Sequence, residues 1–177
     1  MSHGHPNAPP GPVSDWVAGH AHRIGEAGAV LDLACGSGRH TRMMLDRGHP
    51  VTAVDIDVSG LSDIDGRPRL TILEADLEGA PWPLAGQRFA GVIVTNYLWR
   101  PILADIVASV ARDGVLIYDT FAVGNERFGK PSNPDFLLRP GELLEAVRGS
   151  LTVLAYEHGE VQTPKPAVRQ RICARRD

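Results

Sequence analysis

Short runs of apolar, mostly β-branched residues alternate with helix-compatible stretches through most of the chain. We expect strands at residues 29–34, 51–55, 70–73, 89–95, 115–120, 151–156 and 167–174. Helical spacing of apolar residues predicts helices at 13–26, 38–47, 58–64 and 101–112, and another that begins near residue 140. Continuous apolar strands joined by helices are typical of a parallel sheet covered on both faces. The pattern therefore predicts an α/β fold, a doubly wound, Rossmann-like domain.

Two segments depart from this alternation. The last two apolar runs are separated only by residues 157–166, a short polar link that contains proline. Strands joined in this way favour antiparallel pairing, so we expect a hairpin that finishes the sheet. The segment 121–139 is long and rich in Gly, Pro and Asn. Such a segment favours a lid or a binding element, with a mobile surface excursion as the alternative.

The composition is that of one water-soluble domain. The chain has 177 residues, of which 43% are hydrophobic and 22% charged, a balance typical of a single globular unit. Residues 1–12 contain four prolines and predict a flexible tail, which leaves 13–177 as the domain. No apolar run approaches the ~18 residues that a membrane span requires, and the N-terminus lacks the apolar core of a signal peptide. A formal net charge of −3 disfavours a nucleic-acid partner.

The cysteines and histidines bear on the cellular compartment and on metal binding. Cys35 and Cys173 are far apart and too few for a disulfide framework, which fits a reducing, cytoplasmic compartment. The histidines His20, His22, His49 and His158 show no metal-ligand spacing, so we expect no metal site.

A glycine-rich turn follows the first predicted strand. Gly36-Ser37-Gly38 opens the next helix, where bare backbone and free N–H groups suit a ligand with an anionic group. A dinucleotide fingerprint would have a third glycine at Thr41, and here an acid, Asp32, lies in the strand itself. A carboxylate at that place repels a pyrophosphate but can hold an ammonium group, directly or through water. The turn therefore points away from NAD and towards a ligand with a zwitterionic end.

Two more acids follow the next two strands. Asp55 ends the second strand, where a carboxylate can accept both hydroxyls of a ribose. Asp76 follows the third strand and is suited to an exocyclic amine of adenine. Ligands of open α/β sheets bind at the carboxyl ends of the strands, so the three acids are expected to share one site.

These segments resemble the motifs of class I S-adenosylmethionine-dependent methyltransferases. Asp32-Leu33-Ala34-Cys35-Gly36-Ser37-Gly38 resembles their first motif, Val54-Asp55-Ile56-Asp57 their acidic strand-two motif, and Glu74-Ala75-Asp76-Leu77 their adenine-contacting segment. Within that superfamily, residues 38–41 and 47–51 resemble small bacterial tellurite-resistance-type methyltransferases. The resemblance extends from Trp16 to the C-terminus and is strongest over 30–57.

The resemblance implies a cofactor, S-adenosylmethionine, and a set of residues that bind it. It places Asp32 near the methionine amine, Gly36 and Gly38 against the methionine, Asp55 at the ribose, Ile56 on the adenine, and Asp76 with the Leu77 backbone at the adenine edge. Ala34 belongs to the same set, and Thr95 and Asn96 would lie beside the sulfonium. The family also implies a mostly parallel seven-stranded sheet with an antiparallel last strand.

The acceptor side is expected at the end of the fourth strand. Asn96 and Tyr97 are the leading catalytic candidates, with Asp119 as a candidate base or, alternatively, a structural hydrogen-bonding group. Tyr97 and Trp99 are expected to wall the methyl site or to cap the sheet, while Arg100 binds an anionic acceptor or pairs with a surface acid. Asn125 and Arg127, in the long loop, are further candidates for substrate contact. His40 is expected to contact the cofactor carboxylate or to cap the helix start.

The expected reaction is methyl transfer from S-adenosylmethionine to a small molecule, such as a thiol or a chalcogen oxyanion. The residues after Thr95 do not match the Asn-Pro-Pro-Tyr motif of enzymes that methylate nucleic-acid bases or protein amides. Alternatives are a non-catalytic S-adenosylmethionine sensor, a partner subunit, or a methyltransferase acting on RNA or protein. An NAD-dependent oxidoreductase is disfavoured by Asp32 and Thr41.

Overall fold

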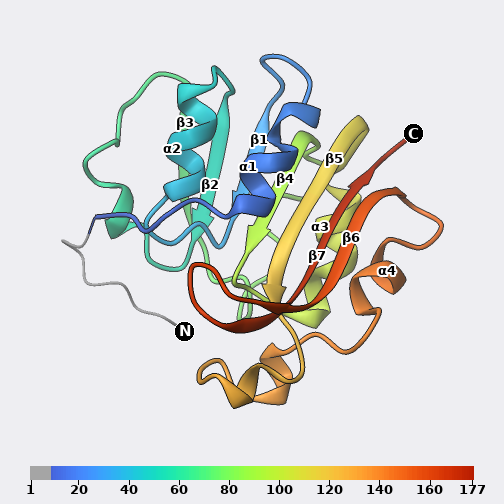
Figure 1. Cartoon of the computed structure of the whole chain (residues 1–177). Coiled ribbons are helices and arrows are strands. Elements are labelled where there is room, and N and C mark those ends of the chain that lie inside the picture. The colour runs from blue at the N-terminus through green and yellow to red at the C-terminus, as the bar shows by residue number, and fades with distance from the viewer. Residues whose placement is uncertain (1–8) are drawn as a thin grey trace.

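A seven-stranded sheet forms the centre of the computed structural model, which describes residues 9–177 (Figure 1). The strands are β1 (Val30–Leu33), β2 (Val51–Asp55), β3 (Leu70–Glu74), β4 (Phe89–Thr95), β5 (Val110–Phe121), β6 (Thr152–Val161) and β7 (Ala167–Arg175). The α-helices are α1 (Asp15–His20), α2 (Arg39–Asp46), α3 (Leu103–Ala108) and α4 (Glu142–Val147). Short 3-10 helices are η1 (Ala21–Arg23), η2 (Ser59–Leu61), η3 (Arg100–Ile102), η4 (Asn125–Arg127) and η5 (Pro134–Phe136).

The strand order is β3-β2-β1-β4-β5-β7-β6. Strands β1 to β5 pair in parallel, whereas β7 runs antiparallel to both β5 and β6. The predicted doubly wound sheet and its terminal hairpin are therefore confirmed. The chain moves outward from β1 to β3 and then returns to β4 on the other side of β1. In open α/β sheets, the crevice at such a reversal is where ligands bind.

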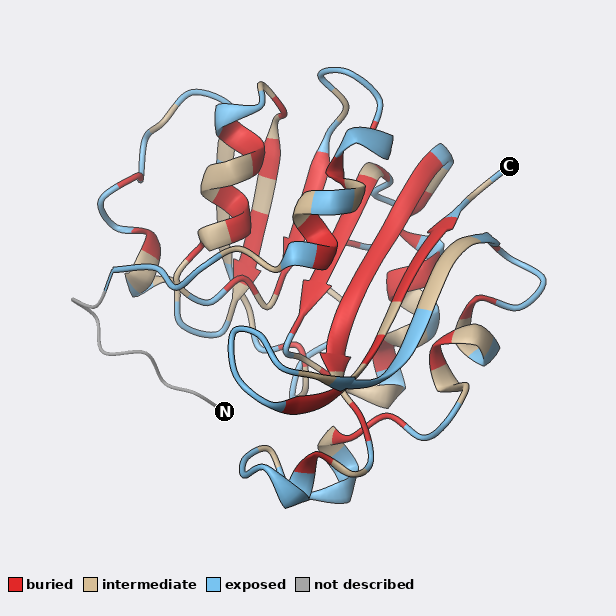
Figure 2. Ribbon diagram, viewed as in Figure 1, coloured by how far each residue is buried: buried red, intermediate tan, exposed pale blue. Residues whose placement is uncertain are grey.

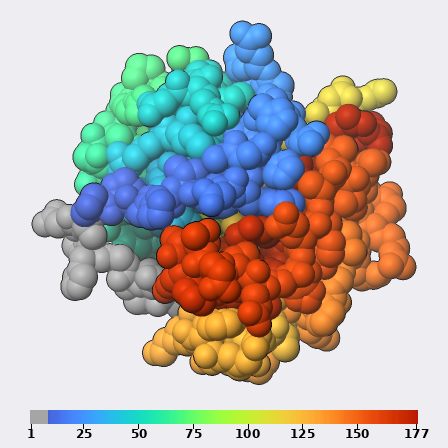
Figure 3. All heavy atoms as spheres, in the orientation of Figure 1, coloured from blue at the N-terminus to red at the C-terminus, as the bar shows by residue number. Residues whose placement is uncertain are grey.

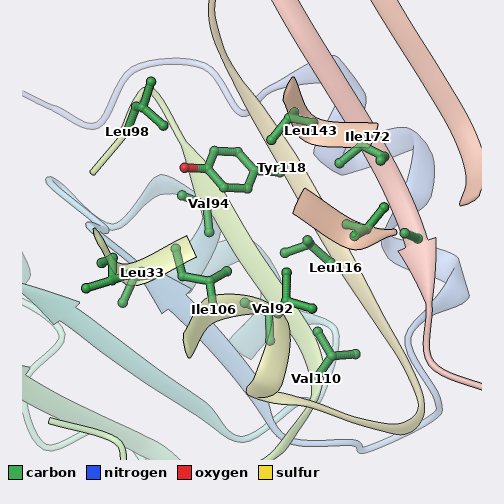
Figure 4. Close-up of a cluster of buried hydrophobic side chains, with 14 of the residues drawn as sticks. Leu33, Val92, Val94, Leu98, Ile106, Val110, Leu116, Tyr118, Leu143 and Ile172 are labelled. Atoms are coloured by element: carbon green, nitrogen blue, oxygen red, sulfur yellow. The ribbon is translucent and has the colours of Figure 1, made fainter. Parts of the chain in front are cut away.

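Each face of the sheet has its own apolar core. On one face α1 and α2 cover side chains such as Val30, Ile93 and Ile117. On the other face α3 and α4 cover the alternate positions, among them Val92 and Val94 (Figure 4). This alternation follows from the two-residue period of a strand and explains why β1, most of β4 and residues 114–120 of β5 are buried (Figure 2). Within residues 9–177, no helix has the length and apolar character needed to cross a membrane.

The helix expected at 58–64 was wrong, and only the single turn η2 forms there. Gly60 lies against the glycine-rich turn, where an added Cβ would come within 3.0 Å of Ser37 Cα. Arg42 then fixes this segment from α2 by donating to Asp63 and to the carbonyl of Gly60. The segment therefore supports the glycine-rich turn instead of covering the sheet as a helix.

The fifth strand starts earlier than predicted. Helix α3 ends at Ala108, and β5 begins at Val110 instead of residue 115. The pairing of β4 with β5 shifts between Phe89 and Gly91, opposite a turn in which Asp113 has φ 61°. An added Cβ on Gly114 would lie 2.9 Å from two carbonyl oxygens, so the bulge depends on glycine.

Candidate functional site

Two glycines of the turn between β1 and α2 have different tasks. Gly36 has φ 54° and is exposed, and a Cβ built on it would have no neighbour within 4 Å. Its backbone is therefore open to a ligand. Gly38 has φ 75° and is buried, and a Cβ there would collide with the side chain of Leu61. Gly38 thus permits tight packing, while Gly36 permits access; Ala34, with φ 54°, begins the same turn.

Asp32 lies beneath this turn and not on its surface. Its side chain is 1% exposed, and the hydroxyl of Thr41 donates to its Oδ2 at 2.6 Å. Burial raises the pKa of Asp32 to about 6, although the hydrogen bond from Thr41 opposes that rise. The structure thus explains why Thr41 occupies the place of the third glycine: it is the partner of a buried acid. The expected contact of Asp32 with a ligand amine stays a prediction.

Asp55 stands beside the open part of the turn. The Gly36 N–H donates to its Oδ2 at 2.8 Å, and the Asp57 N–H donates to its Oδ1 at 3.1 Å. Each oxygen therefore keeps acceptor capacity for a further donor. The next side chain, Ile56, is apolar yet 57% exposed. An acceptor pair and an exposed apolar surface thus adjoin bare backbone at the ends of β1 and β2.

Asp76, the third acid, lies in the turn after β3, and Tyr97 lies near it. Asp76 accepts from the N–H groups of Glu78 and Gly79, which shapes the turn after β3, and Leu77 is buried below it. Burial and the carboxylate of Glu78, with Asp55 and Asp76 farther away, raise the pKa of Tyr97. Tyr97 therefore lies near the acids of β2 and of the turn after β3, and its expected roles in catalysis and substrate contact stay predictions. Glu78 itself was not predicted.

Asp119 is the centre of a hydrogen-bond network that also was not predicted. This carboxylate is 2% exposed and accepts from Ser14 Oγ at 2.7 Å, Arg169 Nε at 2.6 Å and Arg171 Nε at 3.2 Å. Arg169 continues to Asn96, donating to its Oδ1 at 2.6 Å. Because its oxygens are occupied by these donors, Asp119 holds the network together, as in the structural alternative, and is not a free base.

His40 links the same network to the end of β4. Its Nε2 accepts from the Ser14 N–H at 3.0 Å, and its Nδ1 lies 3.4 Å from Thr95 Oγ1. Burial and the neighbouring Arg39 lower the pKa of His40 to about 3, so the ring is uncharged at neutral pH. Both ring nitrogens thus face groups of the protein, and the expected contact of His40 with the cofactor carboxylate stays a prediction. Ser14, whose Oγ also accepts from the Val17 N–H and so caps α1, ties residues 9–14 across the strand ends.

Arg100 fastens the long loop to the body of the domain. Its guanidinium makes two hydrogen bonds with Glu142, at 2.6 and 3.0 Å, and donates to the carbonyls of Asp135 and Leu137. The alternative in which Arg100 pairs with an acid is therefore the one that the structure contains. Trp99, next to it, is partly buried against the core that α3 and α4 cover.

The two expected substrate residues of the long loop are anchors in this structure. Asn125 is 2% exposed, donates to the carbonyl of Pro131 and accepts from the Val168 N–H. Arg127 pairs with Glu160 at 2.7 Å on the surface. The loop is thereby attached to the β6–β7 hairpin, and its buried residues Leu137 and Leu138 attach it to the core. Residues 9–14, the hairpin and the loop lie next to one another on one face (Figure 3).

Comparisons with known proteins agree with this geometry. Residues 30–113 match the family model described as a methyltransferase domain. TehB from Haemophilus influenzae has a TM-score of 0.69 and 18% identity; the alignment covers 92% of this chain and 62% of TehB. The 1,6-didemethyltoxoflavin-N1-methyltransferase of Burkholderia thailandensis has a TM-score of 0.65 and 23% identity, with 91% and 76% covered. A TehB-like methyltransferase of Corynebacterium glutamicum has a TM-score of 0.62 and 19% identity, with 90% and 88% covered.

No curated protein matches the chain significantly in sequence. The similarity consists of the matched domain, which contains the glycine-rich turn and the acids of β2 and of the turn after β3, and of the shared fold. Residues 30–113 are therefore similar to a methyltransferase domain, and the fold of the chain resembles that of the TehB-type structures.

Proposed function

We propose that this protein transfers the methyl group of S-adenosylmethionine to a small-molecule acceptor at the carboxyl ends of β4 and β5. The observation that carries the proposal is the open group of side chains and backbone at the carboxyl ends of two adjacent strands, β1 and β2. It joins the exposed backbone of Gly36, the acceptor oxygens of Asp55 and the exposed side chain of Ile56. These groups fit a ribose, an aromatic base and the chain that connects the ribose to an amino acid.

The chain's own residues divide the work of binding. Asp55 would accept the ribose hydroxyls, Ile56 would pack on the adenine, and Asp76 with Leu77 would contact its edge. Thr95 and Asn96, where β4 ends, would border the reacting centre. When bound, the cofactor supplies an electrophilic methyl group on sulfur, so the protein's task is to align the nucleophile and exclude water.

The contacts on the acceptor side favour a nucleophile that does not have to be deprotonated by the protein. Asp119, the carboxylate beside Asn96, already accepts from Ser14 and from two arginines. Arg169 and Arg171 also line a hollow of ≈310 Å³ in the curled β6–β7 hairpin. A thiolate or a chalcogen oxyanion reacts without losing a proton at the site. A small acceptor is further supported by the Burkholderia neighbour, whose structure contains bound 1,6-didemethyltoxoflavin.

A cytoplasmic location is part of the same proposal. Cys35 and Cys173 are both free thiols and both buried. Unpaired thiols are usual in a reducing compartment, which supports this location.

The first prediction concerns the ribose site. Asp55→Ala should weaken the binding of S-adenosylhomocysteine about tenfold or more, because the removed acceptor is charged. Isothermal titration calorimetry measures this affinity, and Asp65→Ala, at an exposed acid in the same β2–β3 connection, is the matched control. An unchanged affinity of the Asp55→Ala protein would contradict the placement of the ribose. No binding by the unaltered protein would contradict the proposed function.

A second candidate, a non-catalytic S-adenosylmethionine sensor, is favoured by one observation. Asp119, Arg100 and Asn125, all expected to act on the substrate, are engaged in contacts within the protein. A methyl-transfer screen with labelled cofactor distinguishes the two functions. It would include thiols, chalcogen oxyanions, small phenols, carboxylates and tRNA. Turnover with a small molecule supports the enzyme, whereas cofactor binding without turnover in every class supports the sensor.

A further inference from the structure

A hollow of ≈280 Å³ lies between α3 and α4, at the amino ends of the parallel strands. Of the residues that line it, Arg88 directly precedes β4 and Arg176 directly follows β7. The seven residues of β4, at about 3.3 Å each, separate this end of the sheet from Asn96. The hollow is therefore a place that the proposed function does not use.

The charged side chains of this hollow are both cations. Its lining consists of Arg88, Ala104, Val107, Ala108, Ala146, Ser150 and Arg176. Two guanidinium groups and a hydroxyl thus surround small apolar side chains, and no carboxylate is among these described lining residues. Two cations that share one hollow favour an anion between them, because it is attracted to both.

Neither arginine is neutralised by an acid within residues 9–177. Arg176 donates through Nε and Nη2 to two backbone carbonyls, one in the last turn of α3 and one at the start of β5, at 2.7 Å each. These carbonyls orient the guanidinium but carry no net charge. Arg88 is exposed and makes no hydrogen bond or ion pair in the described part of the chain. By contrast, Arg175 next to this hollow is paired with Asp177.

The end of α3 affects the field in the hollow. Carbonyl groups at the carboxyl end of a helix repel an anion, with a partial charge of about half a unit. Arg176 Nη2 donates to one of these groups, the carbonyl of Val107. The full charge of Arg176 outweighs the partial charge of the helix end, and Arg88 adds a second positive charge. The hollow is therefore electropositive.

We propose that this hollow binds a small organic acid, at a second ligand site that is separate from the proposed cofactor site. The planar guanidinium of an arginine matches a carboxylate, to which it donates two hydrogen bonds. The Ser150 hydroxyl is a further donor, and the alanines of α3 and α4 leave room for a short apolar body. A carboxylate with such a body fits both the charged and the apolar parts of the lining.

The two helices that form the walls of the hollow are joined to each other next to the long loop. Helix α3 directly follows η3, whose first residue is Arg100, and α4 begins with Glu142, the partner of Arg100. Ala108 is the last residue of α3, and Ala146 lies in the last turn of α4. A ligand between these ends therefore restrains the same two helices that the Arg100–Glu142 pair joins.

The test uses benzoate as the probe, with benzyl alcohol and acetate as matched compounds. Benzoate should cause saturable NMR shifts of the amide groups at residues 104–108, 146–150 and 176. Benzyl alcohol lacks the charge and acetate lacks the apolar body, so each should bind about tenfold more weakly or worse. The absence of saturable shifts with benzoate would overturn the site. Equal affinity for benzoate and inorganic phosphate would overturn the assignment of an organic acid.

Two substitutions test the lining in different ways. Arg88→Gln should weaken benzoate about tenfold, because it removes a charged donor. Ala146→Leu keeps both charges but fills the hollow, and should abolish binding. Arg112→Gln, at an exposed arginine outside the lining, is the matched control and should have no effect. Unchanged binding in both lining variants would contradict the site, and circular dichroism melts confirm that each variant is folded.

Hydrogen exchange tests the connection to the long loop. Bound benzoate should slow amide exchange at residues 134–142, where the loop meets α4. Binding without this slowing would show that the ligand does not restrain the joined helices. None of these measurements requires S-adenosylhomocysteine to bind, so a failure of this site and a failure of the proposed function are observed separately.

Discussion

Asp32 combines deep burial with a position at the centre of the cofactor side. Its pKa of about 6 lies above the ordinary 3.8 of this group, mainly because burial disfavours the charge. The folded protein therefore holds this proton more tightly than the unfolded chain does. The resulting contribution to stability is fully present below about pH 4 and is lost as the pH rises through about 6.

Replacing the charge should remove this dependence on pH. Asp32→Asn keeps an acceptor for Thr41, so we expect it to stabilise the protein increasingly from pH 4 to pH 7, by up to about 3 kcal/mol. Urea unfolding of both proteins at several pH values measures the difference. The titration of His40 affects both proteins alike and cancels. A difference that stays constant with pH would contradict the assignment, and Asp65→Asn provides an exposed control.

The arrangement of the glycine-rich turn and of Asp55 beside it was predictable, because it depends on local sequence. A glycine-rich turn, or an acid at a strand end, can be recognised from a few consecutive residues. The roles of Asp119 and Arg100 were not predictable in the same way, because their partners lie 50 and 42 positions away. Only the fold shows that Arg169 reaches Asp119 and that Glu142 reaches Arg100. The sequence therefore did not predict which groups of the protein Asp119 and Arg100 contact.

At the scale of elements, the long loop depends on one clamp. Arg100→Ala would leave Glu142, whose side chain is 14% exposed, without its main partner. We expect a loss of about 1–3 kcal/mol in unfolding free energy and faster amide hydrogen exchange over residues 125–139. Arg148→Ala removes the exposed pair with Glu145 and should cost no more than about 0.5 kcal/mol. Equal effects of the two substitutions would show that the clamp has no special role.

Element boundaries were predictable for strands that form continuous apolar runs. The expected ranges 51–55 and 89–95 coincide with β2 and β4. The helix at 58–64 failed because Gly60 must approach Ser37, a tertiary requirement that overrides local helical spacing. The start of β5 was missed because a bulge at Gly114 interrupts the apolar pattern. Tertiary packing, more than propensity, therefore decided the elements next to the site.

At the scale of the whole molecule, ligand binding should stabilise the protein and slow amide hydrogen exchange at one end of the sheet. S-adenosylhomocysteine at about 100 times its Kd should stabilise the protein by about 2.7 kcal/mol. Hydrogen exchange should slow at residues 34–40, 55–60 and 76–79. The hollow between α3 and α4, lined by residues such as Ala104 and Ala146, should not change. Protection centred on that hollow would place the ligand at the wrong end of the sheet.

The long sequence separation of the Ser14–Asp119 hydrogen bond predicts that the two halves of the site form at different stages of folding. This bond joins positions 105 apart, whereas the Gly36–Asp55 bond joins positions 19 apart. Closing a longer loop costs more chain entropy, and Asp119 also needs Arg169 and Arg171 from the last strand. We therefore expect the Gly36–Asp55 region, which is the proposed ribose site, to form early, and the hydrogen-bond network around Asp119 to form last. During folding, the chain would form its proposed adenosine-binding site before its proposed acceptor-binding site.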